Sequence, residues 1–190
     1  MIGLFGGSFD PIHHGHLLAA QAVLEALDLE EIRFVPAFQQ PFKHGRHAAP
    51  AESRARMVQL AIAGEPRFKL DSIELDRPGP SYTVDTLRLL LAKEPGRKFA
   101  LLVGSDAARE LPEWREAVVL PTLAQVIAFA RPGIDLPELP GVSRIVRVPW
   151  VDISATEIRR RVARGQSIRY WVPESVRECI VTQGLYLKDA

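Results

Sequence analysis

Residues 6–16, Gly-Gly-Ser-Phe-Asp-Pro-Ile-His-His-Gly-His, combine glycines and histidines in an order that suits the binding of phosphate. The apolar run at 2–5 predicts a buried strand before them, and apolar residues at helical spacing over 17–27 predict an amphipathic helix behind them. The first turn of a helix carries unpaired N–H groups and the positive end of the dipole, and it therefore attracts anions. The two glycines let the backbone approach a ligand closely. With His13 and His16 as imidazole donors, the segment predicts a phosphate-binding turn ahead of a helix that starts near His16.

Two commoner glycine motifs do not fit this segment. The dinucleotide fingerprint needs G-x-G-x-x-G and the ATPase loop needs G-x-x-x-x-G-K-[ST], and neither is present here. A turn whose histidines only decorate a helix cap is the simpler alternative. Eleven residues that combine Gly-Gly, Asp-Pro and His-x-Gly-His favour the phosphate-binding interpretation.

Composition limits the classes of protein to consider. The chain has 190 residues, a formal net charge of +1 and 47% hydrophobic residues, which is typical of one ordinary soluble domain. A charge this close to neutral disfavours nucleic-acid binding, and no apolar run approaches membrane-spanning length. The single cysteine, Cys179, allows no intramolecular disulfide, and its apolar spacing predicts a core thiol. We therefore expect a cytoplasmic protein without a membrane partner.

The rest of the chain alternates between strand and helix patterns, which predicts the α/β class. The continuous apolar run at 99–103 is typical of a central parallel strand covered on both faces. We expect a Rossmann-like, open, mainly parallel sheet with helices on both faces. Residues 1–190 then form one domain, with 150–190 as a helical C-terminal part. Further strands are predicted at 32–35, 68–75, 126–130 and 145–148, and further helices at 51–63 and after Ser81, Ser154 and Pro173.

Several segments between these elements carry polar residues suited to a site. Residues 37–50 lack a period and predict a loop, made cationic by Lys43 and Arg46. Ser81 fits the N-cap of a helix, whose N-terminus, with the Thr83 hydroxyl, suits a carboxylate. Asp106, in the Gly-Ser-Asp turn after the strand at 99–103, is interpreted either as an acceptor for ribose hydroxyls or as a helix cap.

Residues 153–159, Ile-Ser-Ala-Thr-Glu-Ile-Arg, form a second strong signal. Ser154 and Glu157 have the spacing of a capping box, and a capped helix N-terminus again offers N–H groups to phosphate. Arg159 lies one turn inside that helix, where its guanidinium can bridge two phosphate oxygens. The neighbouring arginines at 160, 161 and 164 are interpreted as a solvated face.

Together these motifs resemble the adenylyltransferase branch of the HxGH nucleotidyltransferase superfamily. Within it the chain resembles the bacterial nicotinate-nucleotide adenylyltransferases along nearly its whole length. The resemblance implies transfer of AMP from ATP to nicotinate mononucleotide, which gives deamido-NAD and pyrophosphate. The chain departs from the family pattern at two positions. Phe42 replaces the histidine of the family's Pro-His-Lys, and Ala155 replaces a second serine.

The resemblance also implies roles for individual residues. Mg²⁺ would arrive with the triphosphate, and no metal site of the protein is predicted. Tyr82 and Thr83 would select the pyridine carboxylate, and Trp114 would stack on the pyridine ring. The implied catalytic residues are His13, His16, Lys43 and Arg159, and the implied ATP-binding residues are Gly7, Ser8, Phe9, Gly15, Gly104, Asp106, Arg131, Ser154 and Thr156.

Three alternatives remain open from the sequence. The first is an adenylyltransferase for nicotinamide mononucleotide or for a phosphorylated pantetheine. The second is a zinc site built from His13, His16, His44 and His47. The third is a catalytically inactive nucleotide-binding regulator. A homo-oligomer is also possible.

Overall fold

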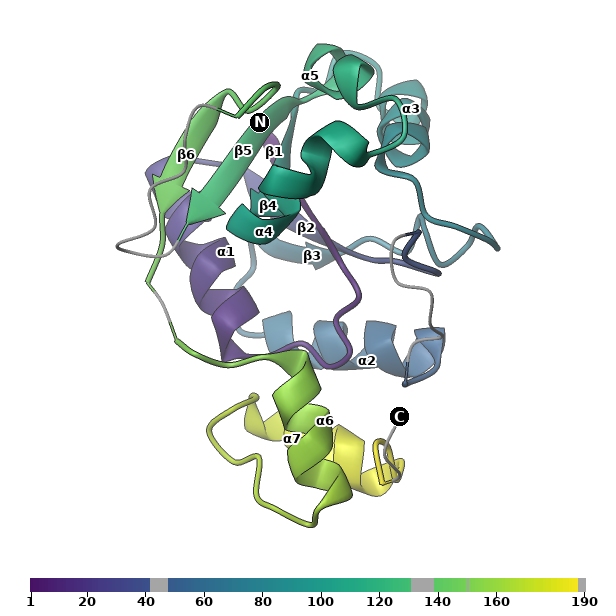
Figure 1. Ribbon diagram of the computed structural model, residues 1–190, viewed down its shortest axis with the longest axis vertical. Coiled ribbons are helices and arrows are strands. Elements are labelled where there is room, and N and C mark those ends of the chain that lie inside the picture. Colours follow the sequence, from purple (N-terminus) through teal and green to yellow (C-terminus); the bar gives the residue numbers. More distant parts are fainter. Residues whose placement is uncertain (42–47, 131–138, 150, 188–190) are drawn as a thin grey trace.

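A parallel sheet of six strands organises the molecule (Figure 1). The computed structural model describes residues 1–41, 48–130, 139–149 and 151–187. Every pair of neighbouring strands runs parallel, in the order β3-β2-β1-β4-β5-β6. The strands are β1 (Ile2–Gly7), β2 (Glu31–Pro36), β3 (Phe68–Leu70), β4 (Phe99–Gly104), β5 (Gln125–Ala130) and β6 (Arg144–Arg147).

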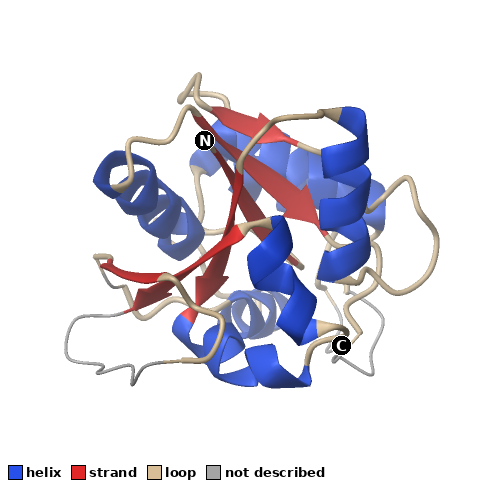
Figure 2. Ribbon diagram, turned by 90° about the horizontal axis from the view of Figure 1, so that it is seen from above, coloured by secondary structure: helices blue, strands red, loops and turns tan. Residues whose placement is uncertain are grey.

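The helices cover both faces of this sheet (Figure 2). This confirms the predicted α/β fold with an open parallel sheet. The α-helices are α1 (His14–Ala26), α2 (Ala51–Ile62), α3 (Thr83–Lys93), α4 (Ser105–Glu110), α5 (Leu120–Leu123), α6 (Ala155–Ala163) and α7 (Glu174–Thr182), and the 3-10 helices are η1 (Leu111–Glu113) and η2 (Ala117–Val119).

The strand order reverses direction between β1 and β4. From β1 the chain moves outward through β2 to β3, and then returns to β4 on the other side of β1. In open α/β sheets, ligands bind in the crevice beyond the carboxyl ends of the strands at such a switch point. Gly7 and Gly104 end these two strands, so the first predicted motif and the Gly-Ser-Asp turn lie at the same crevice.

Two hydrophobic clusters lie on opposite faces of the sheet, because successive side chains of a strand point to opposite sides. Phe5 and Leu102 belong to the cluster that includes residues of α1, α2 and α7. Leu4 and Leu101 belong to the cluster that includes residues of α3. This burial on both faces explains why the central strands have continuous apolar sequences.

The C-terminal helices extend the first of these clusters. Figure 1 shows α6 and α7 on the side of α2 that faces away from the strands. Cys179 and Ile180 of α7 share a hydrophobic cluster with Met57 of α2, and the Ser175 hydroxyl donates to the Leu60 carbonyl at 3.3 Å. Cys179 is buried and burial raises the pKa of its thiol, so its prediction as a core residue is confirmed.

Three element boundaries differ from the predictions. Helix α1 starts at His14 rather than near His16. The strand predicted at 68–75 ends at Leu70, because the Asp71 carboxylate accepts a hydrogen bond from the Ile73 N–H at 3.1 Å and turns the chain. Ser81 is not the N-cap of α3; Tyr82 occupies that position. No helix within the described ranges is long and apolar enough to span a bilayer.

Candidate active site

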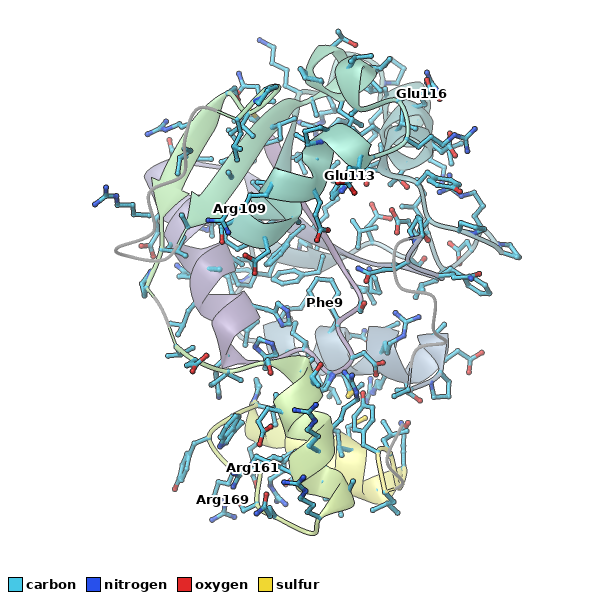
Figure 3. The ribbon with its side chains drawn as sticks, viewed as in Figure 1. Phe9, Arg109, Glu113, Glu116, Arg161 and Arg169 are labelled. Atoms are coloured by element: carbon cyan, nitrogen blue, oxygen red, sulfur yellow. The ribbon has the colours of Figure 1, made fainter. Side chains whose placement is uncertain are left out.

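The turn after β1 is built around the ring of Phe9. This residue has a φ of +47°, which carries its side chain back beneath the turn, where it is 2% exposed. A Cβ on Gly7 would lie 3.1 Å from that ring, which is closer than most such contacts, so a larger residue here would displace Phe9 by a few tenths of an ångström. Figure 3 shows Phe9 between the sheet and α2. The Phe9 side chain therefore packs in the core beneath the turn and is not exposed at its surface.

His13 and His16 lie against each other at the start of α1. Their rings stack with centroids 3.7 Å apart, and the backbone N–H of His13 donates to Nδ1 of His16 at 3.2 Å. A neutral imidazole has one donor and one acceptor nitrogen. Because Nδ1 of His16 accepts this hydrogen bond, the proton of a neutral His16 lies on Nε2.

His13 is buried and neutral. Its side chain lies against Gly15, where an added Cβ would come within 3.1 Å of the ring, and only 6% of the residue is exposed. Burial, with a smaller contribution from His14, lowers the pKa of His13 from 6.5 to about 4. Its Nδ1 has no hydrogen-bond partner among the described residues.

This burial makes folding stability depend on pH. Because the pKa of His13 is lower in the folded than in the unfolded state, the unfolded chain binds a proton more readily between these two values. The free energy of unfolding is therefore highest above pH 6.5 and falls as the pH drops toward 4. We expect the free energy of unfolding to fall by about 2 kcal/mol between pH 7.5 and pH 5 on account of His13. Urea unfolding of the wild type and of His13→Gln at both pH values measures this term. An equal loss in both proteins would contradict it.

Arg159 joins the second motif to the first. The Ser154 hydroxyl caps α6 by accepting from the Glu157 N–H at 3.2 Å, as the sequence predicted. One turn later, the Arg159 guanidinium donates to the Asp10 carbonyl at 2.8 Å and to the Thr156 hydroxyl at 3.4 Å. The structure thus brings the late motif against the opening turn, 149 residues away in sequence.

Asp10 connects this turn to two further segments. Its carboxylate accepts hydrogen bonds from the N–H groups of Ala48 and Ala49, at 2.7 and 3.1 Å, and from the Tyr186 hydroxyl at 2.7 Å. Burial and the neighbouring Asp10 carboxylate raise the pKa of Tyr186, so its phenol stays protonated and donates. Tyr186 could not be predicted as a contact of this turn, because a single tyrosine in this part of the sequence has no motif that links it to Asp10.

Arg54 is a second residue that the sequence analysis missed. It is 1% exposed, and its guanidinium donates to the carbonyls of Ser8 at 2.8 Å and Phe38 at 3.4 Å. Burial lowers its pKa. Its spacing could have identified it, since Met57 and Val58 follow at i+3 and i+4 and form the buried side of α2. Through these two hydrogen bonds, Arg54 links the opening turn to the segment that follows β2.

A cavity of about 390 Å³ opens beside the turn, at the carboxyl ends of β1 and β4. This volume is within the range of small-molecule sites. Tyr82, Thr83 and Trp114 all line it, so the three residues predicted to bind the mononucleotide are brought together. Trp114 is half-buried, and its indole N–H has no partner among the described residues. The Arg115 guanidinium lies 4.7 Å from the centre of the Tyr82 ring.

The N-terminus of α3 faces this cavity without a side-chain cap. Its N-cap, Tyr82, provides none, and the Ser81 hydroxyl that was predicted to cap it accepts instead from the Phe38 N–H at 3.0 Å. The first N–H groups of the helix are therefore free of side-chain capping, and the positive end of its dipole favours an anion.

The remaining predicted residues have varied placements. Asp106 is the second residue of α4, whose N-cap is Gly104, so its interpretation as a cap is wrong. Its exposed carboxylate lies 3.3 Å from Arg109. Lys43 and Arg131 lie outside the described residues. Within the described ranges, no three His, Cys, Asp or Glu side chains gather as a metal site.

Comparison with known proteins identifies the family. The cytidylyltransferase-like family model matches residues 4–161, which include both motifs. A probable nicotinate-nucleotide adenylyltransferase from Thermus thermophilus is 51% identical over 185 residues, covering 97% of this chain and 98% of its own. The chain belongs to the nicotinate-nucleotide adenylyltransferase family. A probable nicotinate-nucleotide adenylyltransferase from Roseiflexus is 46% identical and covers 97% of each chain.

A solved structure from the nicotinate-nucleotide adenylyltransferases has the same fold. The Plasmodium falciparum nicotinic acid mononucleotide adenylyltransferase complexed with NaAD superposes with a TM-score of 0.80 at 21% identity, covering 99% of this chain and 98% of its own. At 21% identity this similarity shows that the two nicotinate-nucleotide adenylyltransferase family members share a fold.

Proposed function

We propose that this protein transfers the adenylyl group of ATP to nicotinate mononucleotide, forming deamido-NAD and pyrophosphate in NAD biosynthesis. The observation that carries the proposal is the contact of Arg159 with the turn that bears His13 and His16, next to a cavity lined by Tyr82, Thr83 and Trp114. The triphosphate would then lie against the turn and the mononucleotide in the cavity.

The reaction needs no general base. A phosphate monoester has a second pKa of about 6, so the attacking oxygen of the mononucleotide is already largely anionic at neutral pH. That oxygen forms a bond to the α-phosphorus of ATP, and the bond from this phosphorus to the bridging oxygen of pyrophosphate breaks. The protein positions the two substrates for reaction. It also compensates the negative charge that develops on the transferring phosphoryl group and on the leaving pyrophosphate.

The donors for that charge come from separate elements. His16 would act through Nε2–H, neutral His13 lies directly against it, and the start of α1 adds the positive end of the helix dipole. Arg159 has donors in a planar fork that matches phosphate oxygens. From the family resemblance, we propose that Lys43 also compensates the negative charge of the phosphates.

The residues present fit a divalent cation that arrives with the triphosphate. Because the described residues gather no cluster of metal ligands, phosphate oxygens and water would supply most of its coordination, as Mg²⁺ prefers. Such an ion would neutralise charge on the phosphates. The chain's own contribution is to hold the triphosphate with Arg159 and the turn of α1. We place this activity in the cytoplasm, in one domain that includes the helical part at 150–190.

Trp114 tests the position of the pyridine ring. We expect Trp114→Ala to raise KM for nicotinate mononucleotide about tenfold, because one aromatic stacking contact is lost. KM for ATP should stay near its wild-type value, since Trp114 lines the cavity and not the turn. Trp114→Phe, which keeps a ring, is the matched control and should recover most of the loss. Equal increases in both constants would contradict the assignment.

The activity itself is tested by pyrophosphate release. Purified protein with ATP and Mg²⁺ is supplied with nicotinate mononucleotide, nicotinamide mononucleotide or phosphopantetheine in parallel. We expect the highest kcat/KM with the nicotinate form. Highest activity with another acceptor would overturn the proposed substrate, and release with none of them would overturn the proposed enzyme.

A further inference from the structure

Glu74 is a buried acidic residue on the wall of the mononucleotide cavity. It lies in the turn that follows β3, only 7% of it is exposed, and it lines the same cavity as Tyr82 and Thr83. The proposed substrate brings a second carboxylate into this cavity. Two like charges in one cavity of this size oppose each other, so the ionisation of Glu74 bears directly on which mononucleotide binds.

The hydrogen bonds around Glu74 reach the start of α3. Its carboxyl group lies 2.7 Å from the Thr86 hydroxyl, which lies 3.3 Å from the Tyr82 carbonyl. A hydroxyl has one proton to donate. When Glu74 is ionised, Thr86 donates to it; when Glu74 is protonated, it donates to Thr86, whose own proton is then free for the Tyr82 carbonyl. The charge of Glu74 therefore changes the bonding of the N-cap residue that lines the cavity.

The charged neighbours of Glu74 offer partial compensation. Arg77, in the same turn, donates to the Thr86 hydroxyl at 3.3 Å rather than to the carboxyl group, while Asp71 opposes ionisation from the end of β3. Across the cavity lie Arg115 and the exposed Glu110. The Ser81 and Thr86 hydroxyls favour the charged form, but burial is the largest effect and raises the pKa of Glu74.

We propose that Glu74 is a specificity-determining residue: as a neutral carboxyl group it admits the pyridine carboxylate beside Tyr82 and Thr83, and as a carboxylate it repels it. The inference rests on the proposed function and deepens it. The neutral carboxamide of nicotinamide mononucleotide carries no charge for Glu74 to repel. Preference for the acid over the amide should therefore decline as Glu74 ionises.

The experiment compares the two mononucleotides between pH 6 and pH 9. The quantity measured is kcat/KM for nicotinate mononucleotide divided by kcat/KM for nicotinamide mononucleotide. Titration of the shared phosphate, the ATP and the histidines cancels in this ratio. We expect the wild-type ratio to fall as Glu74 ionises with rising pH, by about tenfold or more for two like charges about 10 Å apart at an effective dielectric constant of about 20.

Three variants separate this role from a purely structural one. In Glu74→Gln, which stays neutral, the ratio should not change with pH. In Thr86→Val, which removes a hydrogen bond that favours the ionised form, the fall should move to higher pH. Glu110→Gln removes another carboxylate from the same cavity and should leave the fall in place.

The outcomes distinguish this inference from the function on which it rests. A wild-type ratio that is independent of pH would overturn the role of Glu74, as would a Glu74→Gln ratio that falls like the wild type. If Glu74→Gln does not fold, an unshifted profile in Thr86→Val overturns it instead. Release of pyrophosphate with neither mononucleotide would refute the proposed function as well.

Discussion

His16→Ala should lower kcat by about 10²-fold or more, because it deletes one preorganised donor to a developing charge. The hydrogen bond from the His13 N–H to Nδ1 leaves the proton of a neutral His16 on Nε2, the atom proposed to donate. The loss should fall mainly on kcat, since the donor interacts most strongly with the charge of the transition state. Steady-state release of pyrophosphate at saturating substrates measures it.

His14→Ala is the matched control for this change. His14 is two residues away, and its backbone N–H, not its side chain, bonds to the Trp171 carbonyl at 3.2 Å. It should therefore keep near-normal turnover. Thermal unfolding of both variants checks that the fold persists, because the His16 ring also packs 5.2 Å from the Phe9 ring. A His16→Ala enzyme with the turnover of His14→Ala would refute the catalytic role.

Arg159→Ala should lower kcat/KM for ATP by about 10²- to 10³-fold, on the scale of removing a charged donor from a transferring phosphate. It also breaks the 2.8 Å bond that joins α6 to the Asp10 carbonyl. Arg159→Lys should recover only part of the activity, because an ammonium keeps the charge but not the planar fork. Initial rates over a range of ATP concentrations measure both.

Arg160→Ala controls for the loss of a positive charge on α6. Arg160 is 62% exposed and lies 4.0 Å from the nearest Glu157 oxygen, so its removal should leave kcat/KM near the wild-type value. Figure 3 shows that Arg161 also belongs to this C-terminal part. Its guanidinium lies 4.8 Å from the centre of the Trp171 ring. Equal losses in Arg159→Ala and Arg160→Ala would show that only the general charge of α6 matters.

The sequence predicted the central strands and both motifs because their signals are local. A strand covered on both faces has an apolar residue at every position, as in β4, and this pattern is visible without the rest of the fold. The cap of α6 likewise depends on residues three positions apart. The contact between the two motifs could not be predicted from local patterns, since nothing local links Arg159 to Asp10.

The errors and omissions arose from contacts with distant segments. Ser81 has the right chemistry for a cap, but its hydroxyl is taken by Phe38, 43 residues earlier. Arg54 was overlooked because an arginine is normally exposed, and its burial depends on the carbonyls of Ser8 and Phe38. Glu74 lies in a stretch predicted to be strand, and its closeness to the cavity follows from the turn made by Asp71.

The bond between Tyr186 and Asp10 has a consequence for biosynthesis of the protein. The two residues are 176 positions apart, and strands β2 to β6 lie between them in the chain, while β1 precedes Asp10. During translation the strands therefore emerge from the ribosome before the residue that holds the opening turn from the C-terminal side. A nascent polypeptide lacks this anchor until Tyr186 has emerged, so competence for adenylyl transfer should be among the last properties the chain acquires.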